Sequence, residues 1–276
     1  MKAKWFRELL IAMAFVLLLV AAIPATSDKG AIAILKGGGG STRWITPRTD
    51  PEFVYSAENK WAVCIGINDY DGRSSDLLGG PIGDCDEMVA LLVTAGYNIQ
   101  ILKDGAGTAT NIYAAIDWLV ANEDSASEVV FFYSGHGFRT LDSSGFDSDI
   151  ESDGNDEGIV SVDLYGLPDS AVGTHFTGIE STKFAAIFAS CHSGGMFDEG
   201  ELSAANRLII AAAHADQYGW DYSSLSNTLF MYYWFEGFDI YNSFEDAFDY
   251  AYPLVVAEQP DSQPIMSDNY PGDFAL

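Results

Sequence analysis

Two short segments hold the side chains with the clearest chemical potential, an imidazole in one and a thiol in the other. Residues 129–137 read VVFFYSGHG and residues 184–195 read FAAIFASCHSGG, so an apolar run ends at His136 in the first and at Cys191 in the second. A thiol is mostly protonated at neutral pH and needs a base before it can attack a carbonyl. An imidazole can take that proton and later return it to a departing amine. The two segments therefore predict nucleophilic catalysis by a Cys–His dyad.

The elements that position this pair follow from the runs themselves. Runs this short and this rich in Val, Ile and Phe are typical of buried strands in a sheet covered on both faces. A polar group just past the carboxyl end of such a strand lies where open α/β sheets form their ligand crevice. Gly135 and Gly137 permit a tight turn around His136. Gly194 and Gly195 permit a turn whose N–H groups could point at a developing oxyanion.

Strand-like runs recur along the chain with helical patterns between them. The runs occupy residues 61–67, 98–102, 128–134, 184–190 and 206–212. Apolar residues at helical spacing follow Asp84, cover residues 110–121 and indicate two more helices within residues 227–256. This alternation predicts an α/β fold with a mainly parallel central sheet and helices on both faces. The aromatic residues of the last two helices are expected in the core rather than at a ligand site.

The N-terminus has the pattern of a targeting segment. Three basic residues precede an apolar run over residues 9–23, which is followed by Pro-Ala-Thr-Ser, so residues 1–27 are predicted to be a signal peptide. An uncleaved N-terminal membrane anchor is the alternative, although the run is short for a full span. Residues 28–58 contain GGGGS and two prolines and are predicted to be a flexible pro-segment or linker. Residues 59–276 then form one domain of a secreted or extracytoplasmic protein, with no stable membrane span after cleavage.

Composition narrows the range of partners. The formal net charge is −27, which disfavours nucleic acid and anionic lipid and favours cations or substrates with basic side chains. Solubility in a salty environment is the simpler explanation of the same excess. Three cysteines argue against a disulfide framework. Cys64 and Cys85 are expected to pack as small buried residues, which leaves Cys191 as the reactive thiol.

Four motifs together resemble the caspase-like cysteine peptidases, above all the metacaspases and their prokaryotic relatives. They are GINDY at residues 66–70, LGGPIGD at 78–84, YSGHG at 133–137 and SCHSG at 190–194. The resemblance runs from residue 61 to the C-terminus and implies a caspase–haemoglobinase fold and endopeptidase activity on protein or peptide substrates. It also implies that His136 is the general base and Cys191 the nucleophile, with the backbone N–H groups of Gly137 and Cys191 forming the oxyanion hole. No cofactor is required for this chemistry.

The same resemblance implies a specificity pocket for Arg or Lys. Its first carboxylate matches Asp84 and its serine matches Ser134, whereas its second carboxylate falls at Ala189. The pocket is thus expected to keep part of its charge and to favour cleavage after Arg or Lys. Cleavage after Asp is not expected, because no arginine cluster is available to bind a carboxylate.

An acidic loop follows the histidine motif. Seven carboxylates and no Lys or Arg lie between residues 142 and 157. Residues 149–154 resemble the opening of an EF-hand loop. The twelfth position of such a loop would be Val160 in place of the bidentate Glu, so the loop is not an EF-hand. Relatives that depend on calcium hold it with acidic residues in this region, which suggests Ca²⁺ as an activator. The corresponding candidates are Asp153, Asp156, Glu157 and Asp198.

Alternatives to this interpretation stay open. The acidic loop can be a solvated surface without metal. Separately, Arg139 is expected to hold part of this loop near the site. The chain can be a catalytically silent caspase-like module that binds partners in a calcium-dependent way, or a transpeptidase on the same fold. His192, next to the nucleophile, is expected to pack rather than to act as a second base.

Overall fold

The computed structural model describes residues 49–70, 76–145, 153–197, 202–222 and 224–276. These residues belong to one compact unit, Thr46–Leu276. The predicted signal peptide and most of the predicted linker lie outside the described residues.

The central element is a seven-stranded sheet in the order β1-β3-β2-β4-β8-β9-β10. Its five inner strands run parallel, and the two edge strands, β1 and β10, are antiparallel to their neighbours. The strands are β1 (Glu52–Val54), β2 (Lys60–Gly66), β3 (Asn98–Lys103), β4 (Glu128–Ser134), β8 (Lys183–Ala189), β9 (Arg207–Ala211) and β10 (Ile265–Asp268). All five runs predicted to be strands are strands of this sheet. β1 comes from the segment assigned to the linker, so residues 52–54 belong to the sheet.

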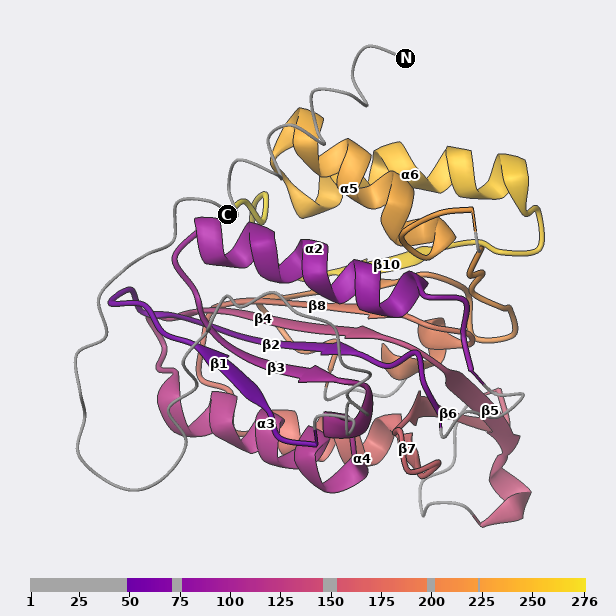
Figure 1. The fold of residues 1–276 in the computed structure, drawn as a ribbon, viewed down its shortest axis with the longest axis horizontal. Coiled ribbons are helices and arrows are strands. Elements are labelled where there is room, and N and C mark those ends of the chain that lie inside the picture. Colours follow the sequence, from indigo (N-terminus) through magenta and orange to yellow (C-terminus); the bar gives the residue numbers. More distant parts are fainter. Residues whose placement is uncertain (1–48, 71–75, 146–152, 198–201, 223) are drawn as a thin grey trace, which may run out of the picture. The chain divides into compact units, whose positions relative to one another are not determined.

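Helices cover both faces of the sheet, as Figure 1 shows. One face carries α2 (Gly80–Thr94), α5 (Leu229–Tyr241) and α6 (Phe244–Glu258), and the other carries α3 (Ala109–Asn122) and α4 (Asp169–Phe176). The predicted α/β class with a mainly parallel sheet is therefore confirmed. α2 begins at Gly80, with Pro81 in its first turn, so it includes Asp84, which the apolar pattern placed before the helix.

The continuous apolar run of β4 follows from this layering. Val129, Phe131 and Tyr133 belong to the core beneath α3 and α4, and Val130 and Phe132 belong to the core beneath α2, α5 and α6. Because successive side chains of a strand point to opposite faces, a strand with a core on each side needs an apolar residue at every position.

A smaller antiparallel sheet extends from the carboxyl edge of the large one. It consists of β5 (Gly137–Leu141), β6 (Asn155–Val160) and β7 (Gly166–Pro168) in that order. These strands, together with α4, β1 and β10, were not predicted from the sequence. Polar residues and glycines interrupt them, so they lack the long apolar run that identified the inner strands.

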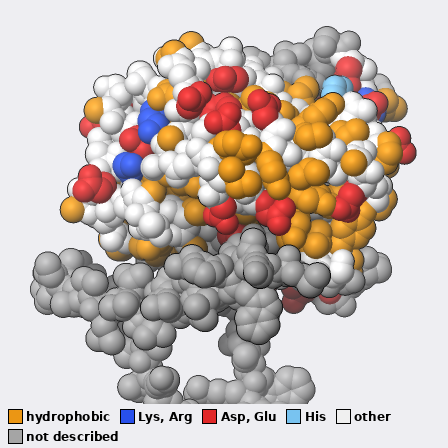
Figure 2. Space-filling view, turned by 90° about the horizontal axis from the view of Figure 1, so that it is seen from above, with side chains coloured by type: hydrophobic (Ala, Val, Ile, Leu, Met, Phe, Trp, Pro, Cys, Tyr) orange, Lys and Arg blue, Asp and Glu red, His pale blue; other side chains and the backbone are white. Residues whose placement is uncertain are grey.

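The acidic side chains on the surface agree with the negative net charge of the chain. On the face that carries α5 and α6, most visible charged side chains are acidic and lie among hydrophobic ones (Figure 2). Within the described ranges, no helix is long and apolar enough to cross a membrane.

Candidate active site

The histidine and cysteine segments lie side by side because β4 and β8 are neighbours. The two strands run parallel, with Ser134 opposite Ala189 at their carboxyl ends. The pairing continues past the strands, since the Gly135 N–H donates to the Ala189 carbonyl at 3.4 Å. Residues 136 and 191 therefore leave the same edge of the sheet from adjacent positions.

Two buried tyrosines hold the backbone of His136. The His136 N–H donates to the Tyr70 hydroxyl at 2.8 Å, and the His136 carbonyl accepts from the Tyr133 hydroxyl at 2.7 Å. The ring of Tyr70 also packs on the imidazole, with centroids 4.6 Å apart. Burial raises the pKa of Tyr70 to about 12, so its hydroxyl stays neutral at physiological pH. From the sequence, Tyr70 was identified only as part of the GINDY motif, and its contact with the imidazole was not predicted.

Cys191 is partly buried, and its thiol lies 3.6 Å from the Gly219 carbonyl oxygen. Burial raises the pKa of this thiol, which is therefore protonated at neutral pH. A neutral thiol needs a base to become a nucleophile. Cys64 and Cys85 are fully buried and free, as expected for packing residues.

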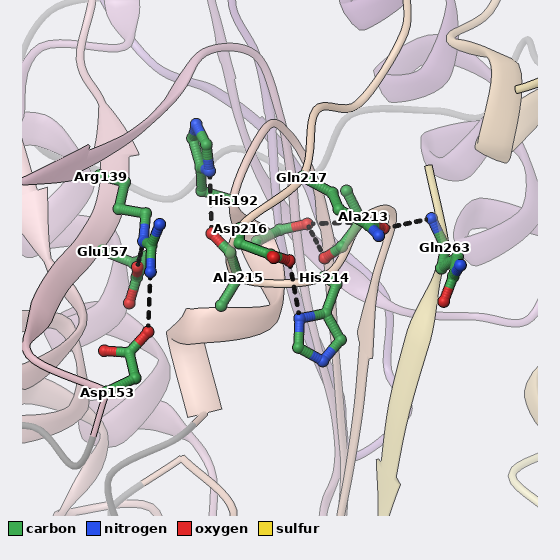
Figure 3. Close-up of polar contacts among 11 residues, drawn as sticks. Arg139, Asp153, Glu157, His192, Ala213, His214, Ala215, Asp216, Gln217 and Gln263 are labelled. Atoms are coloured by element: carbon green, nitrogen blue, oxygen red, sulfur yellow. Dashed lines mark hydrogen bonds and ion pairs between the residues drawn. The ribbon is translucent and has the colours of Figure 1, made fainter. Parts of the chain in front are cut away.

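His192, the residue after Cys191, is bound to a loop. His192 has a positive φ of 56°, its N–H donates to the Gln217 carbonyl at 2.8 Å, and its Nδ1 lies 2.8 Å from the Ala215 carbonyl oxygen. Figure 3 shows the imidazole directed at Ala215. Because a carbonyl can only accept, Nδ1 carries the proton and the ring serves to anchor residues 213–217. This agrees with the packing role expected for His192.

The backbones of Gly137 and Cys191 approach each other closely. A Cβ placed on Gly137 would lie 1.9 Å from the Cys191 carbonyl oxygen, so only glycine fits there. This close approach brings together the backbones of the two residues expected to form the oxyanion hole. The expectation for the later glycines was wrong, because the Gly194 N–H donates to Ala213 and the Gly195 N–H donates to His192 within the fold.

A cavity of about 50 Å³ opens between the two segments. His136 and Cys191 both line it, so the structure places the predicted base and nucleophile at one concave site. The surrounding wall is largely apolar and includes a polar side near α2. The residues of this wall that matter below are Pro81, Ala189, Trp220, Asp221, Thr228 and Phe230.

Asp84 lies just behind this cavity in the first turns of α2. Its carboxylate is fully buried and accepts from the Ser134 hydroxyl at 2.7 Å, the Thr228 hydroxyl at 2.7 Å and the Thr228 N–H at 3.0 Å. Burial raises the pKa of Asp84 to about 7, against the opposing effect of these hydrogen bonds. Asp84 and Ser134 are thus joined by a hydrogen bond, and Thr228, which also binds Asp84, lines the cavity together with Ala189. Asp84 and Ser134 are not among the residues that line it.

Arg139 forms ion pairs with two carboxylates of the acidic loop. Its Nε lies 2.8 Å from Glu157 Oε1 and its Nη2 lies 3.0 Å from Asp153 Oδ2. Figure 3 shows the guanidinium between these two carboxylates. Glu157 is fully buried, and a Cβ on Gly195 would collide with its carboxylate, so Glu157 packs against the turn that follows Cys191. The expected role of Arg139 in holding this loop near the site is confirmed.

Three of the four residues expected to bind calcium lie in the described part of the chain, and they do not form a metal site there. Asp153 and Glu157 share the Arg139 guanidinium, and Asp156 precedes Glu157 on β6, where neighbouring side chains point to opposite faces. Asp198 lies outside the described residues. Among the residues that the structure describes, no three metal-ligating side chains gather into one group. The oxygen donors present are of the kind that Ca²⁺ prefers, but they are fewer than its usual six to eight.

Comparison with known proteins agrees with this geometry. The family model described as the caspase domain matches residues 59–269. Metacaspase-1 of Lodderomyces elongisporus is 34% identical over 166 residues, which is 53% of this chain and 36% of that protein. The chain thus matches little more than a third of the length of this curated relative.

Solved structures show the same fold at low sequence identity. A protein from Geobacter sulfurreducens superposes with a TM-score of 0.59 at 18% identity, covering 75% of this chain and 92% of the other. Caspase-1 from Spodoptera frugiperda superposes with a TM-score of 0.50 at 13% identity, covering 78% of this chain and 88% of the other.

Proposed function

The chain belongs to the caspase-domain family, and on that premise we propose that it is a cysteine endopeptidase. Cys191 is the nucleophile and His136 is the general base. The substrates are proteins or peptides cut after Arg or Lys.

One observation carries the proposal. His136 and Cys191 line the same cavity at the ends of adjacent parallel strands, where a substrate can reach both. The raised pKa of the thiol fits a mechanism in which the base removes the proton as attack begins. Tyr70 and Tyr133 fix the backbone of His136 and so limit where its ring can lie.

The reaction follows from these positions. The His136 imidazole takes the thiol proton while sulfur attacks the scissile carbonyl, and the N–H groups of Gly137 and Cys191 bind the oxyanion. The imidazolium then gives the proton to the departing amine, which leaves an acyl group on Cys191. Water, activated by the same imidazole, hydrolyses this thioester and restores the thiol.

Preference for a basic residue is supported by charge around the cavity. Asp84 is buried behind Thr228, and a pKa of about 7 leaves it substantially ionised at neutral pH. The net charge of −27 adds a long-range attraction for cationic substrates. Ala189, small and apolar, leaves room for the aliphatic stem of Arg or Lys.

We also propose that Ca²⁺ activates the enzyme through acidic residues, for which the candidates are Asp153, Asp156, Glu157 and Asp198. Carboxylate oxygens are ligands of the kind that Ca²⁺ prefers, and Glu157 packs against the turn after Cys191. An ion held there would neutralise repulsion in the acidic loop and connect it to the nucleophile turn. Intrinsic tryptophan fluorescence of the Cys191→Ala protein during calcium titration tests binding apart from activity, and a flat response contradicts it.

The N-terminal pattern supports export, so we propose a secreted or membrane-anchored location. N-terminal sequencing of the protein recovered from its producing cells separates cleavage near residue 27 from an uncleaved anchor.

The function is tested with reporter peptides that end in Arg, Lys or Asp before the scissile bond. Wild type and Cys191→Ala are compared with calcium and with chelator, and an added amine nucleophile reports transpeptidation. Cleavage after Arg or Lys that depends on Cys191 is the expected result. Equal rates in the two proteins, or peptide joining in place of hydrolysis, would overturn the proposal.

A further inference from the structure

A carboxylate that the sequence motifs did not single out lines the cavity beside the nucleophile. Asp221 lies in the segment between β9 and α5, and among the described residues of the cavity wall it is the one acidic side chain. It shares that wall with Cys191, His136 and Ala189. Ala189 is the position where the related pocket has its second carboxylate. That charge is missing here, but the Asp221 carboxylate lines the same cavity.

Backbone donors hold Asp221 in place. Its Oδ2 accepts from the Leu78 N–H, and its Oδ1 accepts from the Gly80 N–H at 3.2 Å, at the start of α2. Burial raises the pKa of Asp221, while these donors act in the opposite direction and favour the carboxylate. A Cβ on Gly80 would lie 2.4 Å from Asp221 Oδ1, so glycine is needed for this approach.

Asp221 is also linked to Asp84 through a shared neighbour. Asp221 and Thr228 form an antiparallel bridge, and Thr228 donates two hydrogen bonds to Asp84. Two carboxylates therefore lie on the same side of the cavity, one at its surface and one behind Thr228. An anionic wall of this kind attracts a cation that enters beside the nucleophile.

We propose that Asp221 supplies the second carboxylate of the specificity pocket and takes the place of the one missing at Ala189. This inference rests on the proposed peptidase function. The guanidinium or ammonium group of the residue before the scissile bond pairs with Asp221, and Asp84 adds charge from behind. The apolar side chains of the wall contact the stem of that residue.

A purely structural role for Asp221 predicts something different. A residue that only ties residues 78–80 to the segment after β9 affects stability and all substrates alike. A specificity residue affects basic substrates selectively, and its charge can be moved to another place in the same pocket.

The test compares wild type, Asp221→Asn, and Asp221→Asn combined with Ala189→Asp. The measurement is kcat/KM on peptides with Arg, Lys or the uncharged norleucine before the scissile bond. Loss of a charged hydrogen bond in a half-buried pocket is expected to lower kcat/KM for Arg and Lys about 10- to 100-fold, with less than about 3-fold change for norleucine. Ala189→Asp is expected to restore much of the loss. Equal loss on all three peptides, or no rescue, overturns the inference.

Two further readouts keep the outcomes separate. If wild type cleaves no peptide in a Cys191-dependent way, the proposed function fails; if it cleaves but Asp221→Asn keeps its basic preference, only the present inference fails. If Asp221→Asn does not fold, Asp221→Glu keeps the charge and moves it by one methylene. A change of several-fold in the ratio of Arg to Lys cleavage is then expected, and an unchanged ratio overturns the inference.

Discussion

The buried carboxylate of Asp84 makes the stability of the fold depend on pH in an unusual direction. Burial raises its pKa from 3.8 to about 7 in the folded protein. Between these values the folded state binds a proton more tightly than the unfolded state does. Asp84 therefore contributes stability that is fully present below pH 3.8 and is lost as the pH rises through 7.

The size of this effect follows from the pKa values. Each tenfold change in proton affinity is worth about 1.4 kcal/mol, so the change from 3.8 to about 7 corresponds to at most about 4 kcal/mol. Asp84→Asn keeps the shape without the charge, and the Ser134 and Thr228 hydroxyls can rotate to accept from the new amide. Removal of the charge stabilises the variant at pH 8, but the amide satisfies these partners less well, so the gain is smaller than about 4 kcal/mol. We expect Asp84→Asn to be more stable than the parent by about 1–3 kcal/mol at pH 8 and no more stable at pH 4.5.

The assay is thermal unfolding from pH 4.5 to 8.5 in a Cys191→Ala background, which prevents self-cleavage. For a domain of this size the gain at pH 8 corresponds to a rise in Tm of about 2–10 °C. Asp249→Asn, an exposed carboxylate on α6, is the matched control for the change in net charge. A difference between Asp84→Asn and its parent that stays constant with pH, or a less stable Asp84→Asn protein at pH 8, refutes the reasoning.

Three other substitutions test single contacts of the site. Gly137→Ala places a Cβ against the Cys191 carbonyl and is expected to lower kcat/KM at least about 100-fold, measured on the best reporter peptide. Tyr70→Phe removes the acceptor of the His136 N–H and is expected to lower kcat about 5- to 20-fold with little change in KM, measured in steady-state kinetics. Arg139→Gln leaves a buried carboxylate without its cation and is expected to lower the free energy of unfolding by about 2–3 kcal/mol, measured in urea.

Matched variants elsewhere in the fold serve as controls for these three. Gly145→Asn alters a glycine in open space with φ of 69°, a conformation that Asn tolerates. Tyr97→Phe removes a buried tyrosine hydroxyl far along the sheet from the site. Lys60→Gln breaks a partly exposed ion pair with Glu128. If the controls lose as much as the site variants, the contacts described above do not explain the losses.

The inner sheet could be predicted from the sequence because each of its strands is buried on both faces. The run of β4 had to be apolar throughout, and its abrupt end at residues 135–137 marked the edge where the candidate site lies. The same logic located Cys191 after β8. Side chains at the ends of adjacent buried strands are close in space because the strand pairing, and not the loop conformation, sets their positions.

The rest of the site could not be predicted because tertiary contacts create it. Asp221 is 30 positions beyond the nucleophile in a segment without periodic pattern, and it reaches the cavity only because residues 78–80 hold it. Tyr70 meets His136 across 66 positions of the chain. The turn of Gly194 and Gly195 was misjudged because the Gly194 N–H donates to Ala213, outside the motif, and the Gly195 N–H donates back to His192 within it.

The central claim is that Cys191 attacks with His136 as its base, and trapping of the acyl group tests it most directly. A peptide ester that ends in arginine is mixed with wild type, His136→Ala and Cys191→Ala, quenched in acid, digested and examined by mass spectrometry. The account predicts an acyl adduct on Cys191 in wild type, a much slower adduct in His136→Ala and none in Cys191→Ala. An adduct on another residue, or equal rates of acylation with and without His136, would contradict it.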